Sequence, residues 1–269
     1  MTSTIPKMKN KTICLNMIVK DESHIIERTL NNLTSYIQFD YWVICDTGSS
    51  DNTISLIKQF FENKNIPGEL VEEEWRDFAY NRTKAIEYAK NKADYLFIFD
   101  ADDTINGDFK LPSILNKDKY SLKYSCHVNN SPITWYRGQI ISTNINWKYK
   151  GVLHEFLVND TVINGSEDIE GNYFVTGSHD GNRSKDPQKW QKDALILENA
   201  FNDEKDIMLK GRYAFYCGQS HKCYGNKEKS IEWYKKVLDL NNWNQEKYYS
   251  AYTIGFLNNQ LGNIDCAIK

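Results

Sequence analysis

Short apolar runs alternate with helical patterns through the first hundred residues, and this alternation most constrains the fold. The apolar runs, which we expect to be buried strands, are 12–19, 41–46, 68–75 and 95–99. The helical patterns between them are 21–37, 47–62 and 77–91. Together they predict an α/β fold with a parallel sheet covered by helices. From 120 to about 180 strand patterns continue without long helices, which predicts an antiparallel extension of the same domain.

Polar, acidic sequences follow three of the expected strands. They are "KDES" (20–23), "DTGSSDNT" (46–53) and "DADDT" (100–104). Ligands of open α/β sheets bind beyond the carboxyl ends of the strands. We therefore expect these loops to form a ligand site.

The third loop fits two chemistries. "FIFDADDTI" (97–105) has the haloacid dehalogenase pattern, in which Asp100 would be a phosphatase nucleophile. That motif normally belongs to the first strand of its domain, whereas three strand–helix units precede it here. In the second chemistry Asp100 and Asp102 hold a divalent cation and a sugar nucleotide, because hard cations take oxygen ligands. A further alternative is a non-catalytic helical-repeat binding protein.

Five segments resemble the family 2 glycosyltransferases, which have the GT-A fold, a Rossmann-like sheet that binds nucleotide-diphosphate sugars. They are "MIVKDES" (17–23), "VICDTGSSDNTISLI" (43–57), "WRDFAYNRTKAIEYA" (75–89), "FIFDADD" (97–103) and "GVLHEFL" (151–157). They occur in the family's order, and the resemblance covers about residues 12–240. The "DTGS" loop is similar to that of members with a tetratricopeptide-like tail, including bacterial peptide S-glycosyltransferases.

The resemblance implies a UDP-sugar donor and gives roles to the polar residues at the strand ends. Asp102 would bind Mn²⁺ or Mg²⁺, with His179 as an additional ligand. Asp100 would bind the ribose or the water shell of the metal, and Asp46 would accept a hydrogen bond from N3 of uracil. The other residues expected around the nucleotide sugar are Glu22, Arg82 and Lys185.

An inverting transferase needs one base near the acceptor. In the resembled family the base is expected in the segment "VLHEFL" (152–157), where we choose Glu155 and place His154 second. We expect this segment to be a strand, whose alternation would send the two side chains to opposite faces. Asp180 is the next carboxylate to consider.

The C-terminal part contains an internal repeat of 37 residues. The matching pairs are Ala214/Ala251, Gly218/Gly255, Gly225/Gly262, Asn226/Asn263 and Ile231/Ile268. This period is close to that of tetratricopeptide helix pairs. We therefore predict a GT-A glycosyltransferase domain at 1–202 and tetratricopeptide-like helical repeats at 203–269, apparently truncated inside the second repeat. These helices would bind a protein, peptide or glycan acceptor, a protein partner or a second copy of the chain.

Composition excludes some partners. The net charge is −3, so nothing attracts the chain to nucleic acid in general. No run approaches the 18 apolar residues that a membrane-spanning helix needs, and the N-terminus has no apolar signal core. The six cysteines include no CxxC pair. We therefore expect a cytoplasmic protein with reduced cysteines.

Overall fold

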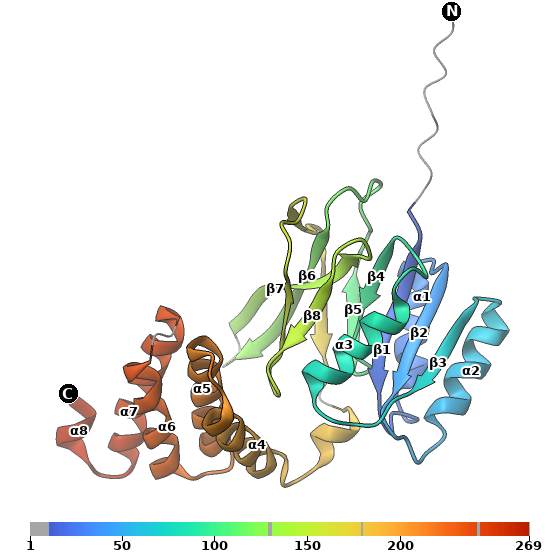
Figure 1. Ribbon diagram of the computed structural model, residues 1–269. Coiled ribbons are helices and arrows are strands. Elements are labelled where there is room, and N and C mark those ends of the chain that lie inside the picture. Colours follow the sequence, from blue (N-terminus) through green and yellow to red (C-terminus); the bar gives the residue numbers. More distant parts are fainter. Residues whose placement is uncertain (1–10, 129–130, 179, 241–242, 269) are drawn as a thin grey trace, which may run out of the picture. The chain divides into compact units, whose positions relative to one another are not determined.

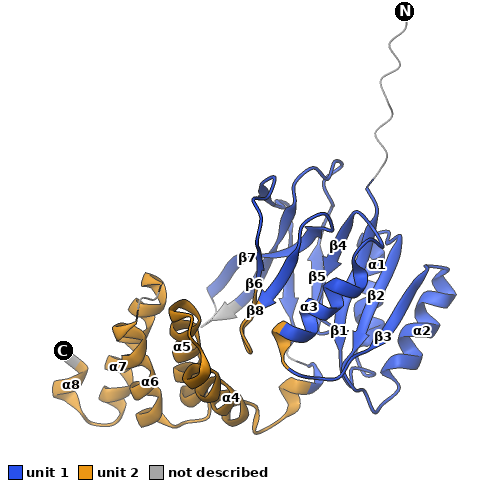
Figure 2. Ribbon diagram, viewed as in Figure 1, with its two compact units in different colours: residues 1–76, 80–149, 157–182 blue, residues 77–79, 150–156, 183–269 orange. Residues whose placement is uncertain are grey.

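The computed structural model describes residues 11–128, 131–178, 180–240 and 243–268 (Figure 1). The chain divides into two compact units (Figure 2). One, here called the sheet unit, comprises residues 1–76, 80–149 and 157–182. The other, the helical unit, comprises residues 77–79, 150–156 and 183–269. The boundary predicted at residue 202 stays a prediction.

The first half of the sheet is parallel, as the alternation predicts. Its strands are β1 (Ile13–Val19), β2 (Tyr41–Asp46), β3 (Gly68–Glu72) and β4 (Tyr95–Ile98), in the order β3-β2-β1-β4. The helices between them are α1 (Ile26–Tyr36), α2 (Thr53–Lys64) and α3 (Phe78–Ala89). Parallel order brings the carboxyl ends of β1, β2 and β4 to one edge of the sheet (Figure 1).

The third strand is shorter than predicted and ends at Glu72 instead of residue 75. The buried side chain of Asn81 accepts a hydrogen bond from the backbone N–H of Arg76 at 2.9 Å. It also donates to the carbonyl of Glu74 at 3.0 Å. Because the Asn81 side chain satisfies these backbone groups of Glu74 and Arg76, they do not pair with a neighbouring strand, and β3 ends earlier.

The second half of the sheet is mixed instead of purely antiparallel. It contains β5 (Asp103–Gly107), β6 (Lys119–Val128), β7 (Ser131–Ser142), β10 (Ser166–Asp168) and β11 (Tyr173–Gly177). The order continues β4-β7-β6-β11-β5, and β7 is antiparallel to both β4 and β6. However, β10 and β11 pair with β6 in parallel. A separate two-stranded sheet joins β8 (Trp147–Lys150) and β9 (Phe156–Asn159).

Helices follow from residue 189 onward. They are α4 (Lys189–Asp203), α5 (Ile207–Cys223), α6 (Lys227–Asp239), α7 (Asn244–Gln260) and α8 (Ile264–Ile268), after a short 3-10 helix, η1 (Asn182–Lys185). The structure therefore has the predicted fold class, an α/β sheet followed by C-terminal helices. No helix in the described ranges is long and apolar enough to cross a membrane.

The 37-residue repeat has a counterpart in the turns between these helices. Gly225 and Gly262 both have positive φ, +92° and +80°, which glycine adopts without a steric penalty. The following asparagines, Asn226 and Asn263, each donate a backbone hydrogen bond of 2.9 Å to the carbonyl five residues before. Equal turns 37 residues apart support a structural repeat, whereas its likeness to tetratricopeptide pairs stays a prediction.

Gly68 at the start of β3 allows a close approach of Trp42. A Cβ at Gly68 would overlap the indole ring, which stacks on Phe61 with 4.5 Å between ring centroids. We expect Gly68→Ala to lower the free energy of unfolding by about 1–3 kcal/mol, the usual cost of overpacking. Urea unfolding measures this.

Gly138 on β7 gives a matched control, because a Cβ there would meet only the flexible side chain of Lys119, at 3.1 Å. Gly138→Ala should change the free energy of unfolding by less than about 0.5 kcal/mol. Equal losses for Gly68→Ala and Gly138→Ala would contradict the assigned packing of Trp42.

Candidate functional site

The loops after β1 and β2 are joined by hydrogen bonds. The carboxylate of Asp21 accepts from the backbone N–H of Ser50 at 2.7 Å, and the N–H of Glu22 donates to the hydroxyl of Thr53 at 2.8 Å. The N–H of Thr47 donates to the carbonyl of Val19 at 2.9 Å. These bonds bring two of the three predicted acidic loops together at the carboxyl edge of the sheet.

Asp46 is buried at the end of β2, and one of its two carboxylate oxygens has no hydrogen-bond partner among the described residues. Its Oδ2 accepts from the N–H groups of Gly48 and Ser49, at 3.0 and 2.9 Å. Its Oδ1 is buried without a hydrogen-bond partner among the described residues. An orphaned buried acceptor is costly unless a ligand satisfies it. Asp46 can therefore accept an N–H from a bound molecule.

Asp100 is held by two arginines from distant parts of the sequence. Its Oδ1 accepts from Arg82 of α3 at 2.6 Å, and its Oδ2 accepts from Arg137 of β7 at 2.8 Å. Burial opposes ionisation of Asp100, but the two guanidinium charges outweigh it and hold the pKa of this carboxyl well below its usual range. Arg82 pairs with Asp100 in the structure, and its predicted place beside the nucleotide stays a prediction. Nothing in the sequence indicated Arg137.

Asp103 belongs to the core at the start of β5. Its Oδ2 accepts from the hydroxyl of Tyr124 at 2.7 Å, and the carboxyl is only 5% exposed. Burial, and then the charge of Asp100, raise the pKa of Asp103 to about 7. The acidic cluster thus contains carboxyls in different environments.

Asp102 faces Ser178 and residues 180–182, which follow β11 and are here called the β11 loop. The backbone carbonyl of Asp102 accepts from the N–H and the hydroxyl of Ser178, at 2.9 and 2.7 Å. A Cβ at Gly181 would come within 3.1 Å of Oδ2 of Asp102, so only glycine leaves this carboxylate its present space. Both oxygens of Asp100 already bind arginine, so Asp100 is a poor candidate ligand for a hard cation.

The β11 loop is also bound to the beginning of α1. Glu22 accepts from the N–H of Asn182 at 3.2 Å. Asp180 forms an ion pair with Arg28 at 2.7 Å, and this hydrogen-bonded pair lowers the pKa of Asp180 to about 2. A carboxylate so held is a poor proton acceptor, which disfavours Asp180 as a base. His179 lies outside the described residues.

His154 and Glu155 belong to the helical unit, and the prediction that strand alternation separates them is wrong. Residues 151–155 are irregular, β9 begins only at Phe156, and His154 is left-handed with φ +53°. The His154 ring stacks on Tyr216 with 3.6 Å between centroids. His154 is exposed, so the desolvation that, with the charge of Arg212, lowers its pKa is only partial. The lowered pKa takes from His154 the basicity near neutral pH that distinguishes an imidazole from a carboxylate.

The remaining predicted residue, Lys185, is exposed in η1 of the helical unit. Its neighbour Arg183 forms an ion pair with Asp193 and lies over the ring of Phe78. The exposed position of Lys185 does not by itself indicate nucleotide binding. Its predicted role stays a prediction.

A second group of ligand-type side chains lies in the helical unit. Glu198, Cys217 and His221 have ligand atoms within 4.8 Å of one another. His221 bonds to Glu198 at 2.8 Å and to the Tyr224 hydroxyl at 2.5 Å, so both its ring nitrogens already have partners. Burial raises the pKa of the Cys217 thiol, which opposes the thiolate that a metal needs. We interpret this group as a buried hydrogen-bond network.

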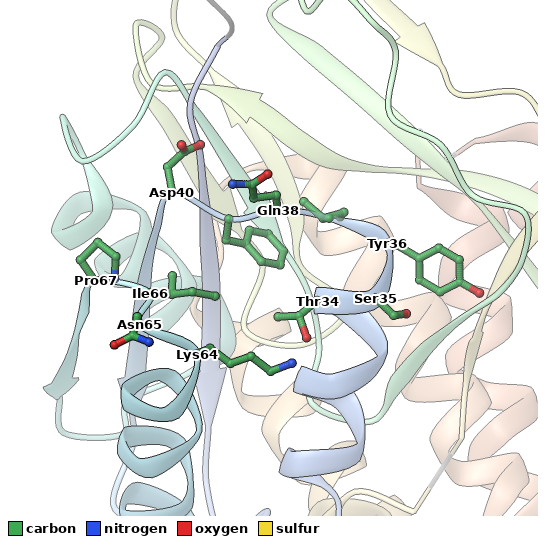
Figure 3. A pocket seen from close by; sticks show the side chains of 11 residues that line it. Thr34, Ser35, Tyr36, Gln38, Asp40, Lys64, Asn65, Ile66 and Pro67 are labelled. Atoms are coloured by element: carbon green, nitrogen blue, oxygen red, sulfur yellow. The ribbon is translucent and has the colours of Figure 1, made fainter.

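A cavity of about 630 Å³ lies at the other end of the sheet. It is lined by residues 34–40 and 64–67, which precede β2 and β3 (Figure 3). The acidic loops follow their strands, so this cavity and the acidic site lie at opposite ends of the strands. We therefore do not assign the cavity to the acidic site.

The family comparison decides between the chemistries left open above. A model described as "Glycosyl transferase family 2" matches residues 14–153, just over half of the chain. The chain belongs to glycosyltransferase family 2. The match includes all three acidic loops and Arg137 but ends before His154 and Glu155. Residues 97–105 lie inside the matched region, so the acidic sequence belongs to a glycosyltransferase domain and does not need a phosphatase nucleophile to account for it.

Individual relatives agree with this assignment. The chain is 23% identical over 258 residues to the SPbeta prophage-derived glycosyltransferase SunS of Bacillus subtilis (strain 168), and equally to glycosyltransferase SunS of Bacillus phage SPbeta. Each alignment covers 90% of this chain and 57% of the relative, so the chain spans little more than half the length of these proteins.

Two solved structures illustrate the similarity. One is S. aureus TarS 1–349 in complex with UDP-GlcNAc, with a TM-score of 0.48, 13% identity and coverage of 92% of this chain and 83% of that chain. The other is the mannosyltransferase PcManGT of Pyrobaculum calidifontis with GDP-Man and Mn²⁺. It has a TM-score of 0.32, 24% identity and coverage of 36% of this chain and 29% of that chain.

The double ion pair of Asp100 predicts a structural role for this residue. Asp100→Asn removes the charge that Arg82 and Arg137 share, and the Arg82 side chain is only 8% exposed. We expect the free energy of unfolding to fall by about 3 kcal/mol, because two partly buried guanidinium groups lose a charged partner. Urea unfolding tests this.

Asp108→Asn is the control, because Asp108 pairs with Lys110 where both side chains are more than half exposed. Its loss should stay below about 1 kcal/mol. If Asp100→Asn costs no more than Asp108→Asn, the ion pairs of Asp100 do not stabilise the fold.

Proposed function

We propose that this chain transfers a sugar from a UDP-sugar to a protein, peptide or glycan acceptor, with inversion and with the help of a divalent cation. The observation that carries the proposal is the buried, unpartnered Oδ1 of Asp46 at the same sheet edge as Asp102. A pyrimidine with an N–H and a metal-bound diphosphate would satisfy these two carboxylates together.

Asp46 would recognise the base of the donor. Uracil carries a hydrogen on N3, and Oδ1 of Asp46 would accept it while Oδ2 keeps its two backbone partners. Cytosine has no hydrogen on N3 and would present an acceptor to the carboxylate. This contrast favours UDP over CDP.

Asp102 would hold the cation, with His179 as the further ligand proposed from the sequence. When bound, the cation neutralises the charge that develops on the leaving diphosphate. The hydrogen bonds from Ser178 to the Asp102 carbonyl and the close approach of Gly181 support a fixed position for this carboxylate. Asp100 would serve the donor indirectly, by keeping Arg82 and Arg137 in place.

Glu155 would remove the proton from the acceptor nucleophile. A base must be ionised at the working pH and within hydrogen-bond reach of the nucleophile. The stacking of the His154 ring on Tyr216 supports Glu155 over His154. The acceptor would bind the helical unit, where α7 exposes Tyr248, Tyr252 and Phe256 four residues apart on one face.

The metal assignment predicts that Asp102→Asn raises the Kd of Mn²⁺ in the presence of UDP by about tenfold or more, because the variant loses one anionic ligand. Electron paramagnetic resonance of free Mn²⁺ measures this directly. The control is Asp108→Asn, which changes an exposed carboxyl outside the acidic loops and should bind Mn²⁺ as the wild type does. Equal Mn²⁺ affinities of Asp102→Asn and the wild type would remove Asp102 from the metal site.

The base assignment predicts that Glu155→Gln lowers kcat by about 10²–10⁴-fold, the usual range for losing a general base. The affinity for UDP and Mn²⁺ should stay near that of the wild type, because the base acts on the acceptor. His154→Asn, in which asparagine tolerates the left-handed backbone, should lower kcat less. Loss of UDP binding in Glu155→Gln would instead assign Glu155 to the donor site.

A further inference from the structure

Arg28 on α1 joins two segments that are 152 residues apart in sequence. Its Nη1 donates to Oδ2 of Asp180 at 2.7 Å and its Nη2 to Oδ1 of Asp180 at 3.2 Å. Its Nη2 also reaches the hydroxyl of Ser178 at 3.4 Å. Such two-point pairing of a guanidinium with a carboxylate fixes direction as well as distance.

We propose that Arg28 is a positioning residue that holds the β11 loop against Asp102 and so shapes the cation site. The proposal rests on the proposed function, in which Asp102 is a ligand of the cation. Arg28 acts through the β11 loop and does not itself touch the donor.

The β11 loop is held to the start of α1 at three points. His24 bonds to the carbonyl of Asp180 at 2.7 Å, and Glu22 accepts from the N–H of Asn182 at 3.2 Å. Of these three contacts, only that of Arg28 directs two separate N–H groups to the two oxygens of one carboxylate, whereas the single N–H of Asn182 is shared between the oxygens of Glu22 at 3.2 and 3.3 Å. Among them the Arg28 pair is therefore the contact that best fixes the orientation of Asp180.

The opposite side of the β11 loop touches Asp102. The strand β11 pairs with β5 so that Gly177 lies opposite Asp103. The next residue, Ser178, then donates twice to the Asp102 carbonyl. Gly181 lies so close that a Cβ would come within 3.1 Å of the Asp102 carboxylate. Movement of the β11 loop would therefore change the backbone and the space around Asp102.

We infer the role of Arg28 from its place beside the β11 loop, because its ion pair with Asp180 contributes little to the stability of the fold. The side chains of Arg28 and Asp180 are 47% and 38% exposed, and pairs this exposed add little to global stability. Without Arg28, the carboxylate of Asp180 would lose its main partner beside Asp102.

Arg28→Met tests the proposal, because methionine keeps the aliphatic stem and removes the charge and the donors. We expect the Kd of Mn²⁺ to rise about tenfold, and hydrogen exchange in a peptide that spans residues 177–182 to become faster. Arg28→Lys should restore part of the Mn²⁺ affinity, since lysine keeps the charge but cannot pair at two points. Combining Arg28→Met with Asp180→Asn should add little to either single change.

Lys11→Met is the matched control. Lys11 pairs with Asp94 at 3.0 Å with exposures of 46% and 36%, close to those of the Arg28 pair, but it precedes β1 at the opposite end from the acidic loops. Lys11→Met should leave Mn²⁺ affinity and exchange in 177–182 unchanged. The proposal is overturned if Arg28→Met binds Mn²⁺ as tightly as the wild type or more tightly, or if hydrogen exchange in residues 177–182 stays at the wild-type rate. A wild type that binds neither Mn²⁺ nor UDP refutes the proposed function instead, and exchange in 177–182 alone then decides whether Arg28 holds the loop.

Discussion

The site depends on the interaction of Asp100 with Arg82 and Arg137. Asp100 follows β4, Arg82 comes from α3 and Arg137 from β7, so one carboxylate joins the parallel half of the sheet, a covering helix and the added strands. The carboxylate alone would be costly to bury, and so would each guanidinium. The three charges together fix the turn that carries Asp102 and Asp103.

This arrangement gives three neighbouring carboxyls three different environments. Asp100 is ionised and bound to arginines, Asp103 is buried on Tyr124 with a raised pKa, and Asp102 faces the β11 loop. Environments that differ this much separate the roles of groups that the sequence presents as one acidic cluster. The same division explains why an Asp-x-Asp sequence alone does not reveal which carboxylate would hold a cation.

The sequence predicts the part of the fold that depends on local periodicity. The strand 41–46 is found as predicted, and the order of strands and helices brings the acidic loops to one sheet edge. Arg137 was not predictable, because its contact depends on β7 pairing with β4, a non-local event. Arg28 was missed for a similar reason, since its partner lies 152 residues away. The strand predicted through His154 fails because Gly151 and His154 both adopt positive φ, which no apolar alternation reveals.

The central claim is that the acidic edge of the sheet binds a uracil nucleotide together with a divalent cation. Calorimetric titration of the chain with UDP and with CDP, each with Mn²⁺ and with a chelator, tests it most directly. We expect UDP to bind in the presence of Mn²⁺ about tenfold or more tightly than CDP, because only uracil offers a hydrogen on N3 to Asp46. We also expect the chelator to remove most of this affinity. Equal binding of UDP and CDP, or UDP binding that is indifferent to Mn²⁺, would contradict the central claim.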